Sequence, residues 1–112
     1  MRIIDGEQTL MRIFIGESDK YDGRPLYNAL VEFFRKEKIA GATVFRGIEG
    51  FGAKSHFHTA NILRLSQDLP IVIEVVDSSE RLEEILPKID PLIHDGLITM
   101  EKVRVVRYAP HT

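Results

Sequence analysis

The order of helix-like and strand-like segments constrains the fold of this chain more than any other feature of its sequence. Two segments repeat apolar residues at helical spacing, and each stands between runs that are typical of β-strands. The order β-α-β-β-α-β predicts an α+β, ferredoxin-like sandwich, in which one antiparallel sheet carries two helices on one face. The expected strands cover residues 10–15, 42–48, 71–76 and 97–108, with helices over 24–39 and after Asp77.

Capping signals fix the expected ends of the two helices. Asp22 is a candidate N-cap of the first helix, and Gly41 is its expected stop signal. Asp77 is the expected cap of the second helix, with Glu80 at capping-box spacing. Pro87 is expected to kink or interrupt that helix.

The length of 112 residues indicates one domain, in which residues 1–9 form an extra strand or a loose arm. Two helices can cover only one face of the predicted sheet. An apolar sheet face without a cover predicts oligomerisation or ligand binding on that face.

Composition excludes several classes of protein. The net charge of −2 argues against a protein that coats nucleic acid. The sequence has no cysteine, which removes disulfides, thiolate metal sites and cysteine nucleophiles. No apolar run approaches the roughly 18 residues of a membrane-spanning helix, and no signal peptide is recognisable, so we expect a cytoplasmic protein.

A glycine-rich segment follows the second expected strand. Arg46, Gly47, Gly50, Phe51 and Gly52 fall within seven residues. Glycine lets backbone N–H groups approach an anion closely, so this segment is a candidate phosphate-binding element. Lys54 follows and could pair with phosphate. A bulged strand that ends in a turn explains the same pattern equally well.

Two further places offer groups for an anion. Asp95 and Gly96 read most simply as a turn, or alternatively as a loop that presents backbone N–H groups. Arg104 on the last strand is a solvated side chain unless it shares a cleft with the glycines. Glu74, in an otherwise apolar strand, is expected at an interface or paired with a basic residue such as Arg46.

His56 and His58 form an H-x-H pair in the loop between the second and third strands. Both imidazoles could share a metal ion, but a zinc site needs three or four ligands and none nearby completes the set. We therefore expect no metal there, and contact with an anionic ligand or a partner protein fits better.

Catalytic groups are hard to find in this sequence. No serine has nucleophile-elbow context, and no pair of carboxylates stands in an acid/base arrangement. The sequence therefore predicts a binding protein with no required cofactor rather than an enzyme.

Taken together, these motifs resemble the PII-like proteins of the uncharacterised kind that carry a G-x-x-G-F-G and H-x-H signature. The matching residues span 11 to 108 and are Gly16-Glu17, Asp19-Lys20-Tyr21, Gly41 to Gly47, Gly50-Phe51-Gly52, His56, His58, Asp68-Leu69-Pro70 and Asp95-Gly96.

The resemblance implies a ferredoxin-like fold and a homotrimer with adenine nucleotides in clefts between subunits. Residues 47–54 would line one side of each cleft, with Asp95, Gly96 and Arg104 of a neighbouring subunit on the other. The loop 52–61 would relay the ligand state to a partner. The phosphate loop keeps Asp95-Gly96 and lacks the lysine that follows in PII proteins, so AMP or ADP is expected rather than ATP.

Two other functions are open at this stage. A metal-responsive trimer would use His56 and His58 from several subunits. A docking module would bind a membrane channel or transporter through the same loop, with no dependence on nucleotide.

Overall fold

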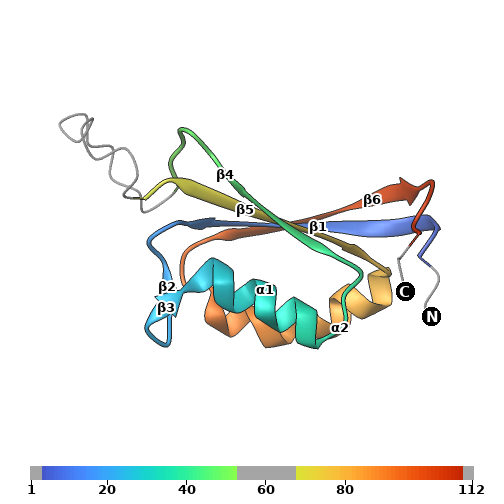
Figure 1. The fold of residues 1–112 in the computed structure, drawn as a ribbon, viewed down its shortest axis with the longest axis horizontal. Coiled ribbons are helices and arrows are strands. Elements are labelled where there is room, and N and C mark those ends of the chain that lie inside the picture. Colours follow the sequence, from blue (N-terminus) through green and yellow to red (C-terminus); the bar gives the residue numbers. More distant parts are fainter. Residues whose placement is uncertain (1–3, 53–67, 110–112) are drawn as a thin grey trace.

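The computed structural model describes residues 4–52 and 68–109 (Figure 1). Along the chain, strand and helix order follows the predicted β-α-β-β-α-β pattern, with one small hairpin added. The strands are β1 (Gly6–Gly16), β2 (Lys20–Tyr21), β3 (Arg24–Pro25), β4 (Ala42–Arg46), β5 (Pro70–Asp77) and β6 (Leu97–Val105), and the helices are α1 (Leu26–Lys36), α2 (Ser79–Ile89) and the 3-10 turn η2 (Asp90–Leu92).

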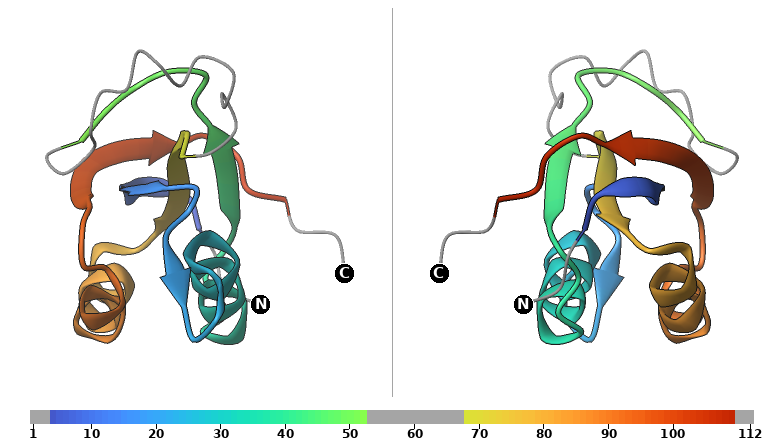
Figure 2. Two further views of the ribbon diagram at one scale, coloured as in Figure 1. Left: turned by 90° about the vertical axis from the view of Figure 1, so that its left-hand side faces the viewer. Right: turned by 90° about the vertical axis from the view of Figure 1, so that its right-hand side faces the viewer.

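The main sheet has four strands in the order β4-β5-β1-β6, and β1 pairs antiparallel with both neighbours. Both helices lie on the same side of this sheet (Figure 2). The arrangement is the predicted α+β, ferredoxin-like sandwich, with β1 as one of the two inner strands. β2 and β3 form a separate hairpin before α1.

The core lies between the sheet and the two helices. Alternate residues of each strand point to one face, so Ile13 and Ile73, which are opposite each other in the register, both face the helices and are fully buried. They meet Leu30 and Phe34 of α1 and Leu82 and Ile85 of α2 in one continuous cluster. Burial of this cluster holds the helices against the sheet.

The first helix is shorter than predicted. It begins at Leu26, after Pro25, whose ring suits a helix start but whose side chain cannot cap it. Asp22 instead adopts a positive φ of 52° in the β2–β3 turn. At the other end the chain turns at Lys38, with a φ of 61°, so Gly41 is not the stop signal.

The second helix also differs from prediction at its cap. The N-cap is Ser78, whose hydroxyl accepts from the backbone N–H of Arg81 at 3.1 Å. Asp77 is fully buried and accepts from the backbone N–H groups of Ala40 and Ser78. Pro87 lies inside the helix, which continues two residues to Ile89 and then tightens into η2. Pro87 removes only one helical hydrogen bond, near the end of the helix, where loss costs little.

Three strand limits differ from prediction because pairing decides them. β1 extends back to Gly6, since Gly6 pairs with Val105 of β6, so residues 6–9 are strand rather than an arm. β6 ends at Val105 for the same reason, before the expected 108. β4 ends at Arg46, where the N–H of Gly47 donates to the carbonyl of Pro70 at 2.7 Å.

Candidate functional site

One end of the sheet gathers most of the predicted site residues that the structure describes. The register places Arg46 opposite Ile71, and Pro70 opposite Gly16. Leu97, which follows Gly96, lies opposite Phe14 at the same end. We call this the loop end of the sheet. The glycine segment after β4 and Asp95-Gly96 before β6 lie at this same end of the sheet, on its two opposite edge strands.

The glycines at the loop end allow close packing. A Cβ atom on Gly47 would lie 2.7 Å from Cγ of Pro70, and one on Gly50 would lie 3.1 Å from the same atom. A Cβ on Gly96 would lie 2.7 Å from the carbonyl oxygen of Phe14. These positions need glycine because neighbouring groups occupy the space of a side chain. These glycines therefore serve close packing at the loop end, whatever else the segment binds.

Beyond Gly50 the chain turns outward. Phe51 is 82% exposed, as expected for a side chain that is available to an external group. The remaining predicted residues of the loop, Lys54, His56 and His58, lie outside the described residues. The described part of the loop end therefore presents an aromatic ring beside the glycine segment.

Arg46 has a different partner from the expected one. Its Nη2 atom forms an ion pair with Oε2 of Glu17, on the turn after β1. Glu74 instead accepts from Nε of Arg12 at 2.8 Å. The register explains the difference, because Glu74 lies opposite Arg12 on the face away from the helices, whereas Arg46 lies opposite Ile71 on the helix face.

Arg104 lies far from the loop end of its own chain. It pairs with Glu7 near the other end of β1, seven residues along β6 from Leu97. At roughly 3.4 Å per residue, this separation is about 24 Å. Arg104 and the glycine segment of one subunit therefore cannot contact the same small ligand.

The sheet face away from the helices, here called the open face, carries two distinct rows of side chains. Residues paired across strands share a face, and the register gives their order. The first row is Phe45, Val72, Phe14 and Leu97; the second is Thr43, Glu74, Arg12 and Thr99. Phe45 and Leu97 are about half exposed, at 49% and 56%.

Charges on the open face are paired with one another. Arg12 donates from Nε to Glu74 and from Nη1 to Glu101 at 2.6 Å. The hydrogen bond to Glu74, followed by that to Glu101, raises the pKa of Arg12 above its ordinary value. The face thus places a cluster of paired charges beside an apolar row, which favours contact with another protein surface over a highly charged ligand.

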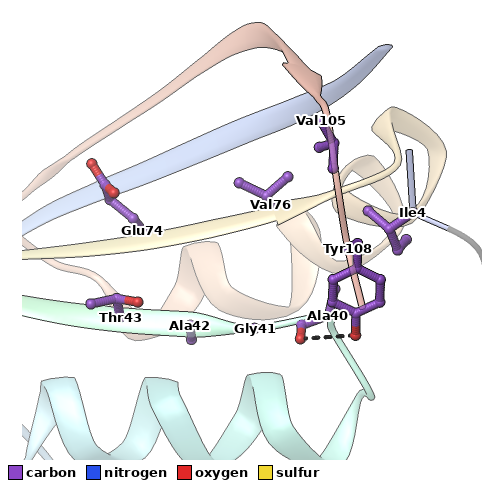
Figure 3. Close-up of a pocket in the computed structure, with 9 residues that line it drawn as sticks. All are labelled: Ile4, Ala40, Gly41, Ala42, Thr43, Glu74, Val76, Val105 and Tyr108. Atoms are coloured by element: carbon purple, nitrogen blue, oxygen red, sulfur yellow. Dashed lines mark hydrogen bonds between the residues drawn. The ribbon is translucent and has the colours of Figure 1, made fainter. Parts of the chain in front are cut away.

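An open hollow of about 430 Å³ lies at the end of the sheet opposite the loop end (Figure 3). The start of β4 and the ends of β5 and β6 contribute to its lining. The hydroxyl of Tyr108 donates to the carbonyl of Ala40 at 3.4 Å. Its walls are mostly apolar, with a hydroxyl and a carboxylate at one side. The lining residues are Ile4, Ala40, Gly41, Ala42, Thr43, Glu74, Val76, Val105 and Tyr108.

Sequence reasoning missed Glu17, Asp68 and most residues of the hollow as members of a site. Glu17 and Asp68 appeared only within the matched motifs, and no spacing rule joins residues so far apart in the chain. The hollow could not be foreseen because the segment after β6 and the start of β4 meet only in the folded chain.

Within residues 4–52 and 68–109, no three histidine, aspartate or glutamate side chains gather closely enough to hold a metal ion. None of the described helices is both long and apolar enough to cross a bilayer.

Comparison with known proteins places the chain in a family. Residues 8–105 match the family model described as "Uncharacterized ACR, COG1993". The chain belongs to this family. It is also 36% identical over 106 residues to a UPF0166 protein of Aquifex aeolicus, covering 95% of this chain and 98% of that one. A UPF0166 protein of Methanocaldococcus jannaschii is 35% identical over 99 residues, covering 88% of this chain and 91% of that one.

Solved structures with the same fold are PII-like. CPII from Thiomonas intermedia K12, bound to ADP, AMP and acetate, has a TM-score of 0.64 at 16% identity and covers 94% of each chain. Its apo form, described as a nitrogen regulatory PII-like protein, has a TM-score of 0.61 at 16% identity, covering 88% of this chain and 91% of that one. The predicted likeness to an uncharacterised PII-like family is confirmed.

Proposed function

We propose that this chain is a cytoplasmic PII-like regulatory protein that binds AMP or ADP in the clefts of a homotrimer and performs no chemistry on it. The observation that carries the proposal is the separation of the candidate binding groups between opposite ends of one sheet whose open face carries an apolar row. A single subunit cannot bring both ends to one ligand, but association through the open face can place the loop end of one copy beside the other end of the next.

The two halves of such a cleft differ in chemistry. The loop end would supply Arg46, Gly47, Asp95 and Gly96 toward the phosphates, with Lys54 from the adjoining loop. Arginine suits phosphate because its planar group donates two parallel hydrogen bonds. Asp95 and Gly96 were expected from the neighbouring subunit; we propose instead that they act with the glycine segment, because both lie at the loop end of one chain.

The opposite half would come from the neighbouring subunit. Its hollow offers apolar walls and the Thr43 hydroxyl, which suit a purine base. Arg104 precedes Val105 of that wall on β6, on the opposite face of the sheet, and would reach the ligand around this edge strand. Phe51, exposed at the loop end of the first subunit, is placed to stack on the base. The loop 52–61 would then carry the ligand state to a partner such as a membrane channel or transporter. That CPII was crystallised with ADP and AMP supports this choice of ligand.

Thermal unfolding with added nucleotide tests the proposal. A ligand that binds only the native assembly raises the melting temperature by mass action. We expect AMP and ADP to raise it, ATP to raise it less, and GTP to leave it unchanged. Arg104→Gln should abolish most of the shift, whereas Lys102→Gln, which removes a charge from the same strand, should keep it. No shift with any adenine nucleotide would overturn the proposal, and a shift with a divalent cation alone would favour the histidine-based alternative.

A further inference from the structure

A single short turn contacts both places where the chain enters and leaves the loop after β4. We call Arg46–Gly47 and Asp68–Pro70 the feet of this loop. The turn is residues 16–19, which follow β1 directly and are held by a hydrogen bond from the N–H of Asp19 to the carbonyl of Gly16 at 3.2 Å. It is the shared attachment of two segments that are more than twenty residues apart in sequence.

The first foot is attached through Glu17. Its carboxylate pairs with the guanidinium of Arg46, and the Glu17 side chain is 17% exposed while that of Arg46 is 57% exposed. The second carboxylate oxygen, Oε1, is buried without a hydrogen-bond partner among the described residues. The pair with Arg46 must therefore offset much of the cost of removing this carboxylate from water.

The second foot is attached through three groups of the same turn. The backbone N–H of Glu17 donates to the carbonyl of Leu69 at 2.8 Å. The N–H and hydroxyl of Ser18 donate to Oδ1 of Asp68 at 3.2 and 2.8 Å. Gly16 makes room for this carboxylate, because a Cβ there would lie 2.5 Å from the same oxygen.

We infer that Glu17 is a positioning residue. It holds Arg46 by one nitrogen, so that the other donors of the guanidinium face an anion. The turn 16–19 then couples anion binding at Arg46 to the position of both feet of the loop. The orientation of Arg46 toward an anion rests on the proposed function, whereas the coupling of the feet does not. Only Nη2 is used by Glu17, and more than half of the Arg46 side chain remains exposed, so donors are left for a phosphate.

The coupling follows from the connections already described. If Arg46 moves, Glu17 loses its counter-charge. Because the backbone N–H of Glu17 is hydrogen-bonded to the carbonyl of Leu69, a shift of Glu17 also reaches the other foot. The turn also reaches α1, because the carbonyl of Asp19 accepts from the N–H of Leu26 at 2.8 Å. An anion that fixes Arg46 is thus expected to steady both feet together.

Hydrogen exchange of the free protein, followed by mass spectrometry, tests the coupling. We expect Glu17→Gln to speed exchange by about fivefold at both feet, measured over residues 44–47 and 69–71, because the variant loses one partly buried ion pair. Arg46→Gln should do the same, and the double variant should add little to either. Glu32→Gln is the matched control, because it removes an exposed partner of Arg24, 3.3 Å away, and should leave both feet unchanged.

The outcomes separate this inference from the proposed function. Unchanged exchange in Glu17→Gln, a change at the first foot alone, or effects that simply multiply in the double variant would overturn the coupling. In titrations with ADP, Glu17→Gln should weaken binding about fivefold in the wild-type background and not at all in the Arg46→Gln background. Weakening in both backgrounds would refute the positioning role. If the wild-type protein binds no ADP, AMP or pyrophosphate, the proposed function and the orientation of Arg46 toward an anion are both refuted. The exchange experiment still decides whether the two feet are coupled.

Discussion

The two faces of the main sheet differ in burial and charge, although the same strands form both. On the helix face, paired positions such as Ile13 and Ile73 are apolar and fully buried. On the open face, the neighbouring positions Arg12 and Glu74 are charged and paired, next to half-exposed Phe45 and Leu97. One face is finished within a single chain, whereas the other has the mixed character of a surface that meets another protein. The chain therefore buries the helix face by its own folding and leaves the open face accessible to another protein.

The largest expected effect breaks the helix face. Ile73→Ala removes a fully buried side chain and leaves a cavity, so we expect it to lower the free energy of unfolding by about 2–5 kcal/mol. Val72→Ala, one residue away on the open face, should cost less. Its cost should also depend on protein concentration, because the proposed trimer would bury this side chain further. Denaturant unfolding at two protein concentrations checks both. Equal and concentration-independent losses would show that the two faces do not differ in this way.

The next effect breaks the open face. Val72→Asp places an unpaired carboxylate in the apolar row that includes Phe14 and Phe45, and association would have to bury it. We expect this variant to run as a folded monomer in light-scattering chromatography and the wild type to run as a trimer. Asn28→Asp adds the same charge on the exposed surface of α1 and should remain a trimer. A wild-type monomer would refute the expected assembly and, with it, the clefts between subunits.

The strand order and the helix-covered core could be predicted from the sequence because local patterns encode them. The apolar run 71–76 and the helical spacing of Leu26, Leu30 and Phe34 specify elements that can pack in few ways. Element limits were less predictable, since β1 reaches back to Gly6 only because Val105 is there to pair with it. Ser78 replaced Asp77 as the cap because the buried Asp77 is used instead to bind the backbone of Ala40.

The candidate site divides in the same way. The glycines and Asp95-Gly96 could be selected from the sequence because glycine marks close approach, and the structure places Pro70 and the Phe14 carbonyl against them. The partner of Arg46 could not be selected, because alternation assigns faces only within a strand. The register between strands, and the turn that brings Glu17 to Arg46, decide which charges meet.

The smallest expected effect sharpens the comparison through pH. Glu37, on the helix side and partly exposed, accepts from Arg81 at 2.9 Å, and this hydrogen bond lowers the pKa of Glu37 below its ordinary value of 4.5. Because the folded-state pKa is depressed, the pair stabilises the protein above pH 4.5 and this contribution is lost as pH falls through the folded-state value. We expect wild type to lose slightly more stability than Glu37→Gln on acidification below about pH 4.5.

Melting temperatures measured from pH 6 to 3 check this expectation, with Glu83→Gln on the exposed surface of α2 as a control that should follow the wild type. The loss at Glu37 should be the same at every protein concentration, because this ion pair joins α1 to α2 within one chain. If the acid response attributed to Glu37 instead varied with concentration, the helix side would also have to be part of an interface, and the division between a finished face and an assembling face would fail.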